Sequence, residues 1–153
     1  MGKLWAVTPI TTGSYGFVDV GGTFTTIDVP FPISGGMEAL GINSGQIVGS
    51  YSNGPDTIGF LDNRGIFTEL QAPFGPTIYY TRPFGINGAG QVVGGHSSPS
   101  DNFLYSGGTF TTLDVSLAND AQALGIIDGG QIVGEYADTS LHGFLDDGEL
   151  SAR

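Results

Sequence analysis

The chain has 153 residues, a length that fits one domain, and it combines 27 glycines with no cysteine and a formal net charge of −11. This negative charge would repel a nucleic-acid backbone or an anionic membrane, so neither is an expected partner, and the lack of cysteine excludes disulfides and thiolate metal sites. Only 12% of the residues are charged while 39% are hydrophobic, which favours short strands joined by tight turns over a disordered acidic segment.

Two sequence blocks alternate along the chain, and each predicts paired strands. The first reads GFVDVGGTFTTIDVP at 16–30, GFLDNRGIFTELQAP at 59–73 and NFLYSGGTFTTLDVS at 102–116, and it begins again as GFLDDGEL at 143–150. The second reads LGINSGQIVGSY at 40–51, FGINGAGQVVGGH at 84–96 and LGIIDGGQIVGEY at 124–136. Two apolar stretches around an Asn/Asp and Gly turn are a strong signal for a β-hairpin.

Together the two blocks define a repeat unit, because Phe17, Phe60 and Phe103 follow one another at intervals of 43 residues. Each unit offers four strands, which in the middle unit cover residues 84–87, 91–96, 102–105 and 109–115. A helix is not expected, since Gly or Pro interrupts nearly every window long enough to hold one. The alanine-containing segment 116–124 is the one weak exception.

A four-stranded meander of this length is the size of a propeller blade. We therefore expect an all-β fold, a small β-propeller of about four blades in a single repeat domain over 1–153, in preference to a solenoid or a sandwich. The units start near Gly2, Gly45, Gly90 and Gly130, and the last is incomplete. Two closures stay open: four blades joined by the chain's own ends in a monomer, or half of an eight-bladed ring completed by a second chain in a homodimer.

The blocks GFLDDG, SGGTFTTLDV and GINGAGQVVG resemble the bacterial "HAF" extracellular repeat. The resemblance extends from Gly2 to Leu150, and HGFL at 142–145 is nearest to the motif that names the family. It implies export and a propeller-like architecture, with no agreed activity and no catalytic residues to transfer. We accordingly expect a secreted, extracellular protein whose signal peptide is not in this chain, since residues 1–7 are too short for one.

Residues that recur in every unit are expected to serve the fold. We predict core packing between blades for the phenylalanines, close backbone approach or turns for the glycines, and turn formation for the Asn/Asp positions. These sets are Phe17/Phe60/Phe103, Phe24/Phe67/Phe110, Gly41/Gly85/Gly125, Gly49/Gly94/Gly134 and Asn43/Asn87/Asp128. His96 takes the place of Tyr51 and Tyr136, which predicts half-buried packing with a polar tip.

One polar register differs in every unit and is the candidate site. It lies three residues before the GIN glycine and holds Glu38, Arg82 and Gln122, with Tyr79, Tyr80 and Asp120 nearby. If the innermost strands line a channel, these residues converge at its mouth, where polar groups and tyrosines suit a neutral small molecule or glycan. The alternative is an ordinary ion pair of Glu38 and Arg82 at the rim of a filled pore.

Three functions are open at this point. The first is a secreted binding module for a neutral small molecule, a glycan or a protein partner. The second is a lyase, isomerase or hydrolase with Glu38 as acid/base and Arg82 or Tyr80 stabilising negative charge. The third is a structural segment of a larger exported protein. No cofactor or metal is expected, and calcium at Asp128, Asp138 and Asp146 has little support because their spacing matches no calcium loop.

Overall fold

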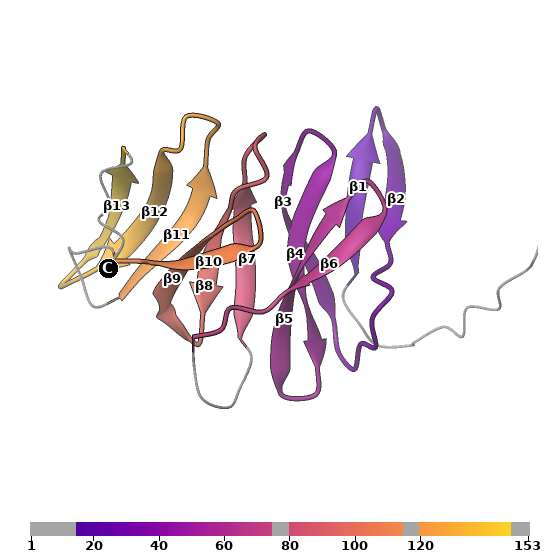
Figure 1. Ribbon diagram of the computed structural model, residues 1–153, viewed down its shortest axis with the longest axis horizontal. Coiled ribbons are helices and arrows are strands. Elements are labelled where there is room, and N and C mark those ends of the chain that lie inside the picture. The colour runs from indigo at the N-terminus through magenta and orange to yellow at the C-terminus, as the bar shows by residue number, and fades with distance from the viewer. Residues whose placement is uncertain (1–14, 75–79, 115–119, 148–153) are drawn as a thin grey trace, which may run out of the picture.

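The computed structural model describes residues 15–74, 80–114 and 120–147, and the regular structure in these ranges is all β-strand. Within these ranges, thirteen strands form four antiparallel sheets, numbered here in chain order (Figure 1). The first sheet contains β1 (Gly16–Val20) and β2 (Thr23–Ile27). The second contains β3 (Met37–Asn43), β4 (Gln46–Asn53), β5 (Asp56–Asn63) and β6 (Ile66–Leu70). The third contains β7 (Thr81–Ile86), β8 (Val92–His96), β9 (Ser98–Ser106) and β10 (Thr109–Leu113), and the fourth contains β11 (Asp120–Ile126), β12 (Ile132–Ala137) and β13 (Leu141–Asp146).

The second and third sheets are four-stranded meanders in which each strand pairs with the next along the chain. All four strands predicted for the middle unit are present, and β11 occupies the described part of the alanine-containing segment. The predicted start of the first unit, near Gly2, lies outside the described residues. The all-β prediction is therefore confirmed, and the sheets begin one strand earlier than the glycines that mark the sequence units.

The turns use the side chains that the sequence indicated. Asn87 Oδ1 accepts hydrogen bonds from the N–H groups of Ala89 and Gln91 and so closes the β7–β8 turn on itself. The same turn is tied to the β11–β12 turn, because Gly88 N–H donates to Asp128 Oδ1 at 2.6 Å and Asn87 Nδ2 donates to the Ile127 carbonyl at 3.1 Å. Asn87 thus forms its turn as predicted, whereas the Asp128 side chain bonds to the β7–β8 turn, and both residues link neighbouring sheets.

The four sheets stack face to face in chain order and enclose three apolar cores (Figure 1). Side chains alternate along a strand, so Ile47 of β4 faces the first sheet while the next residue, Val48, faces the third. The buried residues are Ile27, Met37, Ile47, Tyr51, Ile58 and Phe60 in the first core, Val48, Leu70, Ile86, Val92 and Phe103 in the second, and Val93, Leu113, Ala123, Ile126 and Ile132 in the third.

The innermost strands β3, β7 and β11 approach one another through glycine. A Cβ atom at Gly41 would lie 2.7 Å from the Phe84 carbonyl oxygen, and a Cβ atom at Gly85 would lie 2.8 Å from the Cα atom of Gly125. These distances are shorter than any side chain tolerates, so only glycine permits the contact. In each of the three strands a β-bulge falls immediately before this glycine.

A second glycine in each unit lies opposite a phenylalanine. The cross-strand pairs are Gly49 with Phe60, Gly94 with Phe103, and Gly134 with Phe144. A Cβ atom at Gly94 would lie 2.2 Å from the Arg82 carbonyl oxygen, and one at Gly49 would lie 2.8 Å from the Phe60 ring. Because these glycines have no side chain, the innermost strand can bulge toward them, and the phenylalanine ring on the opposite strand can lie flat over the glycine.

Asn102 joins the third sheet to the fourth through two buried hydrogen bonds. Its Nδ2 donates to the Ala121 carbonyl, and its Oδ1 accepts from the Ala123 N–H, both at 2.8 Å. The matching residue of the second sheet is Gly59, and a Cβ atom there would lie 2.9 Å from the Pro83 ring. Pro83 corresponds to Ala123 but has no N–H to donate, so this interface uses close packing in place of hydrogen bonds.

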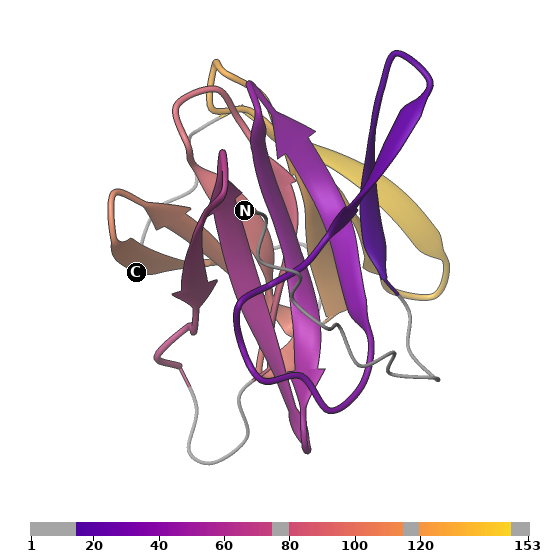
Figure 2. The same ribbon diagram turned by 90° about the vertical axis from the view of Figure 1, so that its right-hand side faces the viewer.

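The phenylalanine prediction holds only where a sheet covers the residue. Phe60 and Phe103 are fully buried, whereas Phe17 and Phe24 of the first sheet are exposed, because no described sheet lies on their side (Figure 2). The first and fourth sheets lie at opposite ends of the stack, so the described residues form an open row of four sheets and not a closed ring (Figure 1).

The glycines of β8 provide a matched test of the close approach. We expect Gly94→Ala to lower the free energy of unfolding by roughly 1–3 kcal/mol, because its methyl group would overlap the β7 backbone. At Gly95 the nearest atom to an added Cβ is 3.8 Å away, so Gly95→Ala should be neutral or stabilise by a few tenths of a kcal/mol to about 1 kcal/mol. Urea unfolding of both variants measures the difference, and equal effects would contradict the steric account.

Candidate functional site

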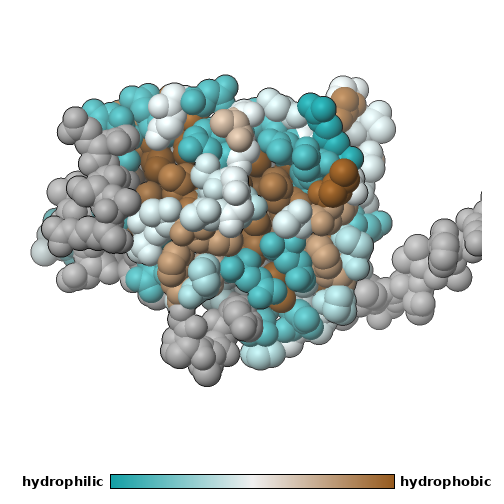
Figure 3. Space-filling view, in the orientation of Figure 1, coloured by the Kyte–Doolittle hydropathy of each residue, from teal (hydrophilic) through white to brown (hydrophobic). Residues whose placement is uncertain are grey.

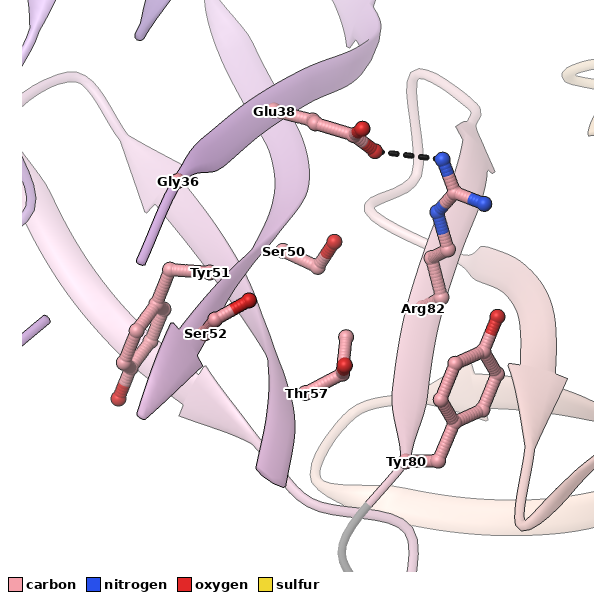
Figure 4. A pocket seen from close by; sticks show the side chains of 8 residues that line it. All are labelled: Gly36, Glu38, Ser50, Tyr51, Ser52, Thr57, Tyr80 and Arg82. Atoms are coloured by element: carbon pink, nitrogen blue, oxygen red, sulfur yellow. Dashed lines mark hydrogen bonds and ion pairs between the residues drawn. The ribbon is translucent and has the colours of Figure 1, made fainter. Parts of the chain in front are cut away.

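Glu38 and Arg82 meet across the gap between the second and third sheets. Glu38 lies on β3 and Arg82 on β7, at the same register of neighbouring innermost strands. A guanidinium nitrogen of Arg82 lies 2.5 Å from Glu38 Oε2 and forms an ion pair (Figure 4). Both side chains keep a substantial exposed fraction, 33% for Arg82 and 50% for Glu38, so a ligand from solvent can reach them.

A cavity of about 330 Å³ lies beside this ion pair. Its wall comes from both sheets, and Thr57 of β5 forms a parallel bridge with Tyr80 just before β7, which fixes the two sheets at this end. Figure 4 shows the Tyr80 hydroxyl directed toward Arg82, and Ser50, Ser52 and Thr57 below Glu38 and to the left of Tyr80 in this view. The lining residues are Gly36, Glu38, Ser50, Tyr51, Ser52, Thr57, Tyr80 and Arg82.

Arg82 is held from several sides. Partial burial lowers the pKa of Arg82, but the hydrogen bond to Glu38, the negative charge of Glu38 and the neighbouring Tyr80 hydroxyl raise it more, so the net pKa is raised. The guanidinium carbon also lies 5.3 Å from the centre of the Phe84 ring, a cation–π distance. Arg82 is therefore a fixed positive donor group at the mouth of the cavity.

Tyr51 belongs to the scaffold of the cavity. Its side chain points away from the other lining residues, stacks on Phe31 with ring centroids 5.6 Å apart, and donates its hydroxyl hydrogen bond to Glu69 on β6 (Figure 4). Burial, the hydrogen bond to Glu69 and the charge of Glu69 all raise the pKa of Tyr51. This phenol is thus kept neutral and positions β4, on which Ser50 and Ser52 lie.

A second hollow, of about 370 Å³, shares the Glu38 and Arg82 side chains with the first. Its other walls are largely apolar or backbone and come from Tyr15, the first sheet and β3, with Phe17 and Met37 among them. The ion pair therefore separates a hydroxyl-rich cavity from a more apolar one, and both open on the same two charged groups.

The structure assembles part of the predicted register. Glu38, Arg82 and Tyr80 line one cavity, but Gln122 lies half-buried on β11 and does not line it. Tyr79 lies outside the described residues, and Asp120 is placed only as the first residue of β11. The hydroxyl residues Ser50, Ser52 and Thr57 were not predicted. Ser50 occupies the place of Gly95 and Glu135, so variation between units was the signal that could have indicated it.

The three aspartates considered for calcium do not gather at one place, and Asp146 is the last residue of β13. Asp128 is in the β11–β12 turn, whereas Asp138 is in the β12–β13 turn at the other end of β12, where His142 Nε2 lies 3.1 Å from its carboxylate. Within residues 15–74, 80–114 and 120–147, no three His, Cys, Asp or Glu side chains gather as a metal site. Nor does this part of the chain contain a helix long and apolar enough to cross a membrane.

His96 is buried on β8, more fully than the half-buried packing predicted for it. Its ring lies 4.8 Å from that of Phe74, and its Nδ1 lies 3.3 Å from Ser97 Oγ, while Nε2 has no hydrogen-bond partner among the described residues. Burial lowers the pKa of His96 and outweighs the opposing effects of Asp101 and the Phe74 backbone. The imidazole is therefore neutral in the folded protein near pH 7.

Comparisons of the chain with protein-family models, with curated proteins and with solved structures gave no match. The similarity to the HAF repeat therefore stays a prediction from the sequence blocks.

Acid should destabilise the fold through His96. The folded-state pKa lies below the ordinary value of 6.5, so the unfolded chain binds the proton more readily, and stability is fully present above about pH 6.5 and decreases as the pH falls below it. We expect the thermal midpoint of the wild type to fall more between pH 7 and pH 5 than that of His96→Phe, which keeps an aromatic ring against Phe74. Equal losses in the two proteins would show that other groups cause the acid sensitivity.

Proposed function

We propose that the chain is a secreted binding module of propeller-like construction whose Glu38–Arg82 cavity takes a small neutral ligand rich in hydroxyl groups, such as one sugar unit of a glycan. The observation that carries this proposal is the ion pair of Glu38 and Arg82 beside a hydroxyl-lined cavity of about 330 Å³. A cavity of this volume is at the lower end of the range for small-molecule sites.

The chemistry of the wall suits a polyol. Each ligand hydroxyl is both a donor and an acceptor, so it can donate to the Glu38 carboxylate while accepting from the Arg82 guanidinium. The two charges offset each other, which favours a neutral ligand over an ion. Ser50, Ser52 and Thr57 add hydroxyls, and Tyr80 adds an aromatic edge with a polar tip.

The propeller-like construction is supported by the stack itself. Two complete four-stranded meanders follow one another, with β3, β7 and β11 in contact along one edge and the outer strands β6 and β10 at the other. Blades of a propeller are arranged in this way around an axis. Export is proposed on the similarity to the HAF repeat alone.

Binding is favoured over catalysis by the way in which the charged groups are used. Glu38 and Arg82 engage each other across the sheets in an ion pair, and Tyr80 lines the same wall with its hydroxyl directed toward Arg82 (Figure 4), so the acid/base and the cation proposed for an enzyme hold each other in place. Because these side chains are already held in place, they form a rigid recognition surface and lose little conformational freedom when a ligand binds. A turnover assay on any sugar that binds would separate the two functions.

The proposal is tested with a glycan panel followed by titration calorimetry of the best ligand. We expect Arg82→Met to weaken binding at least tenfold, because a hydrogen bond to a charged group contributes about 1.5–3 kcal/mol and each 1.4 kcal/mol is a factor of ten. Arg64→Met is the matched control, since Arg64 is an exposed arginine that donates to the Ser44 carbonyl far from the cavity wall. It removes the same charge and should leave the affinity unchanged.

Two results would count against this site. One is the absence of binding by any neutral sugar or polyol up to millimolar concentration. The other is an equal loss of affinity in Arg82→Met and Arg64→Met, which would indicate an effect of net charge and not of the cavity.

A further inference from the structure

The two ends of the stack expose the residues that are buried between the inner sheets. At the first sheet, Phe17 and Phe24 are 61% and 68% exposed, and at the fourth sheet, Val133 and Leu145 are 46% and 63% exposed. Apolar side chains are visible at the surface over the first sheet (Figure 3), and Figure 2 shows the β1–β2 hairpin as the nearest described element at that end. We call the Phe17/Phe24 surface the front face and the Val133/Leu145 surface the back face.

The repeat shows what each face is built to contact. In the second core, Val48 and Leu61 of the second sheet pack against Phe103 and Phe110 of the third. Val133 and Leu145 occupy the positions of Val48 and Leu61, and Phe17 and Phe24 occupy those of Phe103 and Phe110. The second sheet uses this pair of residues to pack against Phe103 and Phe110. The back face of the fourth sheet therefore carries the contact residues that suit a phenylalanine pair.

The front face is already formed in the single chain. The rings of Phe17 and Phe24 meet edge to face with centroids 5.4 Å apart, and those of Phe103 and Phe110 do so at 5.3 Å. The exposed pair thus has the arrangement that its counterpart has in the buried core. A preformed aromatic pair loses little side-chain freedom on docking.

The front and back faces cannot meet within one chain of this structure, because they lie at opposite ends of the row (Figure 1). We propose that they meet between two copies of the chain, with the back face of each copy on the front face of the other. This head-to-tail contact is heterologous, and such contacts close into a ring when the rotation between copies permits. Two copies would carry eight sheets, within the range of four to eight blades seen in propellers.

The dependence on salt distinguishes an apolar contact between the two copies from a contact held by ion pairs. Each chain carries a formal net charge of −11, so two copies repel each other at low ionic strength, while the proposed contact is apolar. Added salt should therefore strengthen the assembly, whereas it would weaken a contact held by ion pairs.

Mass measurement of blocked variants tests the proposal. We expect the wild type to show twice the 15.8 kDa chain mass in size-exclusion chromatography with light scattering, more completely at high salt. Phe17→Asp blocks only the front face and Leu145→Asp only the back face, so each variant alone should be monomeric. An equimolar mixture, measured above the concentration at which the wild type dimerises, should restore a two-chain species through the one intact contact.

Controls separate assembly from folding. Ile66→Asp changes an equally exposed apolar residue on the outer strand β6, away from both faces, and should leave the mass unchanged. Circular dichroism of each variant should retain the β-sheet signal, since the changed residues are exposed in the single chain. Binding by the Glu38–Arg82 cavity is measured separately, so either proposal can fail without the other.

Four results would overturn the head-to-tail contact. These are a monomeric wild type at all concentrations and salts, a dimer of either variant alone, a mixture that stays monomeric, and a species larger than two chains. A dimer of Phe17→Asp alone, for example, would mean that two back faces meet, and a larger species would mean that the ring does not close at two copies.

Discussion

The contact between the backbones of β3, β7 and β11 determines how the rest of the molecule is arranged. Gly41, Gly85 and Gly125 remove the side chains that would keep these strands apart, so the sheets come together at their inner edge and enclose apolar cores behind it. The same approach brings the residues three positions earlier within reach of one another. Glu38 and Arg82 can pair across two sheets because no side chain at Gly41 or Gly85 holds β3 and β7 apart.

The stack is close to one-dimensional, since each sheet packs mainly on the sheets before and after it. The candidate cavity therefore depends on one interface, that between the second and third sheets, where Thr57 bridges Tyr80. The hydrogen bond from buried Tyr51 on β4 to exposed Glu69 on β6 helps to make the second sheet a rigid wall for this cavity. An exposed ion pair contributes little to stability, so Glu38 and Arg82 are free to serve recognition.

Much of the fold could be predicted from local signals. The Asn and Gly turns and the 43-residue period located the strands, and the recurrence of Phe60 and Phe103 identified the core. The pairing of Glu38 with Arg82 was one of the two alternatives that their shared register left open. The environment of Phe17 could not be predicted, because it depends on which sheet neighbours the first one, and that is not a local property. Ser50 and Thr57 were missed because their approach to Tyr80 depends on the angle between two sheets.

Asn102 and Gly59 have a consequence for how the repeats can be ordered. Asn102 needs an N–H on the following sheet, which Ala123 supplies, and Gly59 leaves room for a ring, which Pro83 supplies. A sheet with asparagine placed before one with proline would lose a donor and gain a clash, and the converse order would leave a backbone N–H unpaired. In each of these two sheets, a single residue therefore specifies which sheet can follow it. The sheets cannot exchange places, although their strands and turns are alike.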